Sequence, residues 1–186
     1  AKVIGAAVKQ KLGLSTDDPL LHADSPFGDY YISRHLDAET STKVKQAAIA
    51  AIADHPQVET VLDGEEIAKL PMPSGTPEEW SLADRARASF HADRSGDFIV
   101  LLKKGVTPIP STARGYVATH GSPWDYDRGV PILFWRAGMK GFEQPLAVKT
   151  VDIAPTLGSL IGVDMSGDDI DGRCLDLDAG AGSNCN

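Results

Sequence analysis

The chain has 186 residues, of which 42% are hydrophobic and 24% are charged, a composition typical of a globular protein with enough apolar side chains for a core. This length suits one ordinary domain and is too short for two large ones. Lysine and arginine number 18 against 26 acidic residues, and the formal charge of -8 argues against a nucleic-acid binder, which needs a positive face for phosphates. No run of about 18 apolar residues occurs, so we predict no membrane span.

The first residues of the sequence contain no initiator methionine and no signal-peptide pattern. One interpretation is a processed N-terminus. We instead expect the sequence to be the later part of a longer protein.

Short elements follow one another through residues 1–90. The pattern predicts a helix over 1–12 that Gly13 ends, a strand over 28–32, and a helix that begins near Asp37 and stops before Pro56. The apolar stripe of this second helix consists of Val44, Ala47, Ala48, Ala51 and Ile52. The series continues with a strand over 58–62, a short helix over 64–70, a proline-rich loop over 71–77 and a helix over 78–88. We interpret residues 1–90 as a small α/β insertion or cap region.

Two unbroken apolar runs, residues 98–102 and 130–135, change the character of the chain after residue 90. Such runs are typical of strands buried on both faces of a parallel or mixed sheet that helices cover. Asp152 is suited to cap a helix over 153–161, which Gly162 ends. We therefore assign residues 91–186 to the core of a larger α/β fold.

Cys174 and Cys185 are the two cysteines, and both lie in a polar, glycine-containing tail. Such a pair favours a disulfide bridge, which by closing about a dozen residues would stabilise the fold by roughly 3 kcal/mol. Two free surface thiols are the alternative, and a metal pair is disfavoured because no histidine lies nearby. We predict the bridge and, with it, an oxidising compartment.

Among the five histidines, His120 has the most suggestive surroundings. It precedes Gly121, which allows backbone to approach a ligand closely, and it lies between the two predicted buried strands, where open α/β sheets gather their sites. The others lie in polar stretches or at a helix end, and we interpret them as surface or structural residues: His22, His35, His55 and His91.

No complete catalytic set accompanies His120. The sequence contains no paired-histidine or paired-cysteine metal motif, no Gly-x-Ser-x-Gly and no glycine-rich phosphate loop. Ser122 is disfavoured as a nucleophile because the proline after it gives no elbow geometry, and we interpret Asp125 and Asp127 as solvated carboxylates. The residues alone thus predict one candidate metal ligand.

Several segments, in their order along the chain, resemble the C-terminal part of the alkaline phosphatase superfamily. They are residues 118–124 (ATHGSPW), 130–135 (VPILFW) and 151–157 (VDIAPTL), joined by 94–97 (RSGD) and 170–177 (IDGRCLDL). More closely, the chain resembles the secreted, zinc-dependent alkaline phosphatases with a threonine nucleophile, which are relatives of the nucleotide pyrophosphatase/phosphodiesterases. The resemblance implies the C-terminal part of a three-layer α/β sandwich.

In that family the active site holds two zinc ions, and by match His120 is the late ligand of one of them. The other ligands, the nucleophilic threonine and the phosphate-contacting groups have no counterpart here, which implies that an N-terminal portion of the same protein carries them. The resemblance implies that the two ions would supply Lewis acidity for transfer of the phosphoryl group to the threonine, from which water would release phosphate. We therefore expect a periplasmic or secreted phosphoric monoester hydrolase for small phosphate esters, with this chain inactive alone.

Two alternatives stay open at this point. One is a phosphodiesterase or nucleotide pyrophosphatase of the same superfamily, because the residues around the phosphate that decide this preference have no counterpart in the chain. The other is a non-catalytic binding module that keeps the sheet and the helix.

Overall fold

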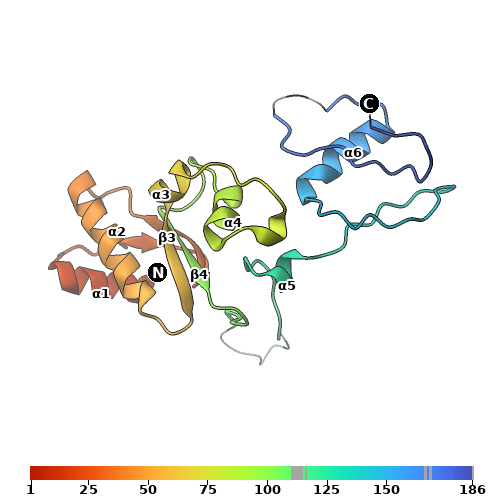
Figure 1. Ribbon diagram of the computed structural model, residues 1–186. Helices are drawn as coiled ribbons and strands as arrows, with labels where there is room; N and C mark the ends of the chain where they lie inside the picture. Colours follow the sequence, from red (N-terminus) through yellow and green to blue (C-terminus); the bar gives the residue numbers. More distant parts are fainter. Residues whose placement is uncertain (110–114, 116, 166, 168, 186) are drawn as a thin grey trace. The chain divides into compact units, whose positions relative to one another are not determined.

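A computed structural model describes residues 1–109, 115, 117–165, 167 and 169–185 (Figure 1). It divides into two compact units, the first made of Ala1–Gly75 and Trp80–Arg128, the second of Thr76–Glu79 and Gly129–Asn186. Among the described residues, no helix is both long enough and apolar enough to span a bilayer.

The first unit is built on a four-stranded sheet in the order β1-β2-β4-β3, and every pair is antiparallel. The strands are β1 (Leu21–His22), β2 (Gly28–Ile32), β3 (Val58–Asp63) and β4 (Phe98–Leu102). Our prediction of a parallel or mixed sheet is wrong for these strands. The connection that leaves β3 at Asp63 returns opposite it at Phe98, so β4 runs back along β3.

The position of β4 explains its unbroken apolar sequence. It is a central strand between β2 and β3. Both partners come before residue 90 in the sequence, so the domain boundary that we expected there falls between paired strands of one sheet. Phe98 is fully buried and stacks on Tyr30 of β2, with the ring centroids 5.1 Å apart. The helices α1 (Lys2–Leu12) and α2 (Ala38–Ala53) pack side by side in Figure 1 and contribute to one core with the sheet. This core comprises Val8, Leu20, Leu21, Tyr30, Ile32, Val44, Ala47, Ala48, Ile52, Val58, Phe98 and Val100.

The two long helices begin and end at signals that the sequence carries. Gly13 ends α1 with φ 64°, in the left-handed region that glycine favours. Asp37 caps α2, and its carboxylate accepts a hydrogen bond from the Thr40 backbone N–H. The buried face of α2 consists of Val44, Ala47, Ala48 and Ile52. Ala51, which we predicted to lie on this face, is exposed.

Two further helices connect β3 to β4. Helix α3 (Gly64–Lys69) is capped by Asp63. The helix predicted over 78–88 is instead a 3-10 turn, η1 (Pro77–Glu79), followed by α4 (Leu82–Ser89). Helix α4 begins later than predicted because Ser81 and Asp84 form a capping box at its start.

The second unit contains the 3-10 turn η2 (Thr150–Asp152) and helix α6 (Ile153–Leu160), close to the predicted helix. Residues 130–135 form no strand, and Leu133 and Trp135 are 89% and 83% exposed, so the predicted buried strand is wrong for this structure. A strand needs a neighbour for its backbone hydrogen bonds, and the described residues supply none beside this run.

Asp152 organises the second unit without capping the helix that follows it, contrary to prediction. Its carboxylate is buried and accepts hydrogen bonds from the backbone N–H groups of Lys149, at 2.8 Å, and Arg173, at 3.0 Å. The Thr156 hydroxyl donates to the Asp152 carbonyl at 2.6 Å and accepts from the Leu175 N–H at 2.9 Å. The start of α6 is therefore bonded to the segment that leads into the C-terminal tail.

The C-terminal tail carries the predicted disulfide. Cys174 and Cys185 are bridged, with their Cα atoms 5.7 Å apart. The Asn184 side-chain amide donates to the Ser159 hydroxyl at 3.0 Å and to the Leu175 carbonyl at 3.1 Å. Bridge and amide together tie the tail to α6, and the prediction of the bridge is confirmed.

Candidate functional site

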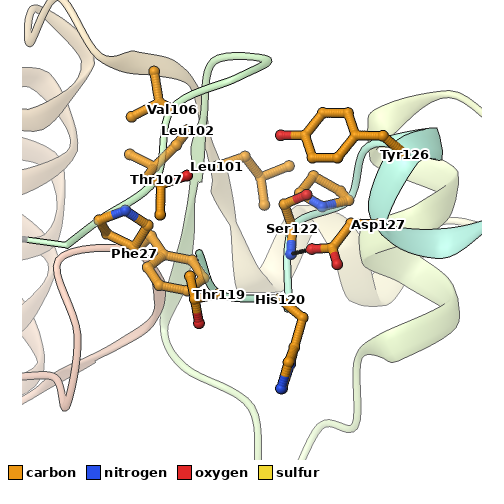
Figure 2. A pocket seen from close by; sticks show the side chains of 12 residues that line it. Phe27, Leu101, Leu102, Val106, Thr107, Thr119, His120, Ser122, Tyr126 and Asp127 are labelled. Atoms are coloured by element: carbon orange, nitrogen blue, oxygen red, sulfur yellow. Dashed lines mark hydrogen bonds between the residues drawn. The ribbon is translucent and has the colours of Figure 1, made fainter. Parts of the chain in front are cut away.

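His120 lies in the first unit, on the chain that leads from β4 to the short helix α5 (Asp125–Arg128). Its side chain is exposed, and in Figure 2 the imidazole extends away from Leu101 and Tyr126. It makes no hydrogen bond with any residue that the structure describes. A neutral imidazole presented in this way can donate a ring nitrogen to a metal ion.

The turn that follows His120 is tied to the end of β4. The Trp124 indole N–H donates to the Leu102 carbonyl at 2.9 Å. The Gly105 backbone N–H donates to the Tyr126 hydroxyl at 3.2 Å. These two contacts attach the turn to the sheet by groups on either side of the start of α5.

Helix α4 holds the same turn through Arg85, which is 9% exposed. Its guanidinium donates to the Pro123 carbonyl at 2.7 Å and to the Trp80 carbonyl at 2.9 Å. It also forms an ion pair with the Asp125 carboxylate at 2.7 Å. Asp125 is solvated, as predicted, with its side chain 65% exposed, and in addition it is the partner of a buried cation.

Asp127 closes the turn that carries His120. Its carboxylate accepts a hydrogen bond from the Ser122 backbone N–H at 2.6 Å, drawn as the dashed line in Figure 2. This bond, with a smaller contribution from the charge of nearby His120, holds the pKa of Asp127 below its ordinary value. Asp127 therefore has a structural role in the turn that we did not predict.

A shallow hollow lies beside this turn (Figure 2). Most of its wall is apolar, with Phe27, Leu101 and Val106 among the lining residues, and His120 adds a polar group. The Ser122 hydroxyl is buried and has no hydrogen-bond partner in the described part of the chain. A serine nucleophile needs a base within hydrogen-bond reach, so nothing in this arrangement activates Ser122.

The described residues contain no group of three or more His, Cys, Asp or Glu side chains that could hold a metal ion. Two of the remaining histidines make local contacts: the Nδ1 atom of His55 accepts from the Gln57 N–H, and that of His91 accepts from the Asp93 N–H. Since a zinc site takes three or four protein ligands, His120 does not form one with the other described residues.

The turn before β4, which carries part of the resemblance, has a structural role. The Asp97 carboxylate accepts from the Ile32 backbone N–H at 2.7 Å and pairs with the Arg34 guanidinium at 3.1 Å. The Gly96 N–H donates to the Asp29 carboxylate at 2.6 Å. These contacts fasten the start of β4 to β2.

Sequence reasoning missed Arg85 as part of this site. An arginine in a short polar helix is normally solvent-exposed, and no spacing relates residue 85 to residue 120. The one available signal was the Ser81 capping box, which fixes where α4 starts and therefore which way its side chains point.

Comparisons with known proteins place this site in a family context. No family model matches the chain. It is 51% identical over 185 residues to the alkaline phosphatase PhoK of a Sphingomonas species, covering 99% of this chain and 33% of that protein. It is 48% identical over 176 residues to the alkaline phosphatase PhoD of Zymomonas mobilis, covering 95% of this chain and 30% of that protein.

The fold agrees with a solved relative. The crystal structure of the wild-type alkaline phosphatase PafA matches 94% of this chain with a TM-score of 0.73 and 26% sequence identity, and the match covers 31% of that chain. PafA of Elizabethkingia meningoseptica is also similar in sequence, with 28% identity over 166 residues. The chain spans about a third of the length of these relatives. The chain is a partial homologue of the alkaline phosphatases PhoK, PhoD and PafA.

Proposed function

We propose that this chain is part of a zinc-dependent alkaline phosphatase that hydrolyses phosphate monoesters, and that His120 is one of its zinc ligands. The observation that carries the proposal is the exposed imidazole, unbonded to the described residues, on a turn braced by Arg85 and Asp127. A braced turn fixes a ligand before the metal binds, which limits the entropy lost on binding. The reaction class follows from the relatives, which are alkaline phosphatases at 51% and 48% identity.

An imidazole fits zinc as a donor, but the described residues offer no set that could hold the ion alone. We propose that the remaining ligands of two zinc ions, and the threonine that becomes phosphorylated, lie in the rest of the polypeptide. When bound, zinc supplies Lewis acidity toward the phosphoryl oxygens. The part of His120 is to offer an uncharged nitrogen, and that of Asp127 is to hold the backbone at Ser122 so that the imidazole keeps its place.

The second unit supports the existence of that further polypeptide. It exposes large apolar side chains that a finished globular protein would cover, each at least 60% exposed: Val130, Leu133, Trp135, Leu146 and Ile161. The relatives are about three times as long as this chain, which leaves ample sequence to cover them. We propose that the rest of the polypeptide covers these side chains and completes a three-layer α/β sandwich.

The disulfide supports an oxidising compartment. A bridge between Cys174 and Cys185 persists in the periplasm or outside the cell and is reduced in most cytosols. We therefore propose that the phosphatase is periplasmic or secreted.

The test is hydrolysis by the full-length polypeptide of 4-nitrophenyl phosphate, a monoester, and bis(4-nitrophenyl) phosphate, a diester. We expect the monoester to have the higher kcat/KM. We also expect His120→Ala to lower it by about 100-fold or more, because a metal contributes several kcal/mol to the transition state. His91→Ala is the matched control, since His91 is also an exposed loop histidine. A preference for the diester, or full activity in His120→Ala, contradicts the proposal.

A further inference from the structure

Arg85 is an unusual residue for a short surface helix, because its side chain is only 8% exposed. Burying a guanidinium is costly unless its donors are satisfied. Here they meet two backbone carbonyls, of Trp80 and Pro123, and the Asp125 carboxylate. The guanidinium of Arg85 therefore joins the start of helix α4 to a turn about forty positions further along the chain.

The contacts of Arg85 fall on residues that follow His120 by a few positions. Pro123 lies three positions beyond His120, and Asp125 is the first residue of α5. The Asp127 carboxylate bonds to the Ser122 N–H on the same turn. The backbone from residue 122 to residue 127 is thus held at several points, whereas the imidazole itself makes no hydrogen bond with the described residues.

We infer that Arg85 is a positioning residue for His120, holding the turn at Pro123 and Asp125 so that the imidazole is fixed where a metal ion can take it. This inference rests on the proposed function of His120 as a zinc ligand. It also gives helix α4 a role in the metal site, although α4 lies in the part of the sequence interpreted as a cap or insertion. Groups that orient a ligand without touching the metal typically change metal affinity by about 10- to 100-fold when removed.

A planar guanidinium is required for this role. Its donors point in fixed directions and meet a carbonyl and a carboxylate together, whereas a lysine ammonium is a single point charge on a flexible stem. Arg85→Lys should therefore retain the charge and lose much of the positioning. Arg85→Met removes both the charge and the donors while filling a similar volume.

The test is zinc affinity of the full-length protein, measured by competition with a chromogenic chelator on samples that circular dichroism shows to be folded. We expect zinc to bind about 10- to 100-fold more weakly in Arg85→Met than in the wild type, and also more weakly, but by a smaller factor, in Arg85→Lys. Amide hydrogen exchange at Ser122 and Asp127 should accelerate in both variants, a readout that needs no metal.

The matched control is Arg87→Met on the same helix. Arg87 also donates to a backbone carbonyl, that of Leu70, but it does not contact the turn after His120. A role in stability alone predicts that both methionine variants unfold more easily and bind zinc as the wild type does. Zinc affinity within twofold of wild type in folded Arg85→Met or Arg85→Lys overturns the inference.

His120→Ala, measured in the same titration, separates this inference from the proposed function. If His120→Ala loses a zinc ion and the Arg85 variants keep their affinity, only the positioning role fails. If His120→Ala binds zinc as the wild type does, the proposed function fails, and the inference falls with it.

Discussion

Asp152 offers the sharpest stability prediction, because a buried carboxylate joins two segments that are distant in sequence. The two carboxylate oxygens accept hydrogen bonds from the backbone N–H groups of Lys149 and Arg173, and Asp152 is only 1% exposed. Close packing adds to this arrangement, since any side chain at Gly172 would collide with the Val151 carbonyl. Replacing Asp152 by alanine leaves both N–H groups without an acceptor.

The expected cost follows from those two bonds. An N–H group that loses its acceptor inside a protein costs about 1–3 kcal/mol. Both donors are only part-buried, so water reaches them in part, and the low end of that range, about 1–1.5 kcal/mol per donor, applies. We therefore expect Asp152→Ala to destabilise the joint between α6 and the C-terminal segment by about 2–3 kcal/mol. Asp152→Asn keeps one acceptor oxygen and should cost about half as much.

Amide hydrogen exchange measures this joint directly. Opening that becomes easier by about 2–3 kcal/mol accelerates exchange by about 30- to 150-fold. The amides to follow are those of Arg173, which donates to Asp152, and Leu175, which donates to the Thr156 hydroxyl. Asp171→Ala, an exposed acidic residue in the same segment, is the control and should leave both rates unchanged. Unchanged exchange of the Arg173 amide in Asp152→Ala would refute this reasoning.

The remaining predictions concern the core, the tail and the turn. Phe98→Ala removes a fully buried ring that stacks on Tyr30. In urea titrations it should lower the free energy of unfolding of the first unit by about 3–5 kcal/mol. A loss under about 1 kcal/mol would contradict the packing that we describe. Replacing Cys174 and Cys185 by serine together should destabilise the second unit by about 3 kcal/mol, measured by thermal unfolding, whereas an unshifted transition would mean that the other tail contacts suffice. The Asp127 carboxyl should titrate below the ordinary aspartate pKa of about 3.9, because the charged form accepts from the Ser122 N–H. The charged carboxylate therefore stabilises the folded turn fully above the ordinary pKa, and this stabilisation is lost as the pH falls through the lowered pKa of the folded state. A titration followed at the carboxyl carbon that gives a midpoint at or above the ordinary value would contradict this prediction.

The elements of the first unit could be predicted because their signals are local. Gly13 and Asp37 mark helix ends within one turn of chain, and the apolar run of β4 stands out against its polar neighbours. Strand β1, with two residues, carries no periodicity and was not predicted. Strand direction was mispredicted because an unbroken apolar run reports burial on both faces, and a central antiparallel strand meets that condition as well as a parallel one.

Residues 130–135 show that a local sequence pattern is not enough to predict a strand. Their apolar sequence correctly indicates a preference for burial, but a strand forms only with a partner, and the described residues hold none for this run. The candidate site divides in the same way. His120 was predicted from its motif, whereas the contacts of Arg85 and Asp127 with the turn depend on tertiary structure that no spacing in the sequence encodes.

The zinc content of the purified full-length protein tests the central claim most directly. Inductively coupled plasma mass spectrometry on protein dialysed against metal-free buffer gives the number of zinc ions per molecule. The account predicts two for the wild type and for His91→Ala, and one fewer for His120→Ala. An equal zinc content in His120→Ala and the wild type would contradict it.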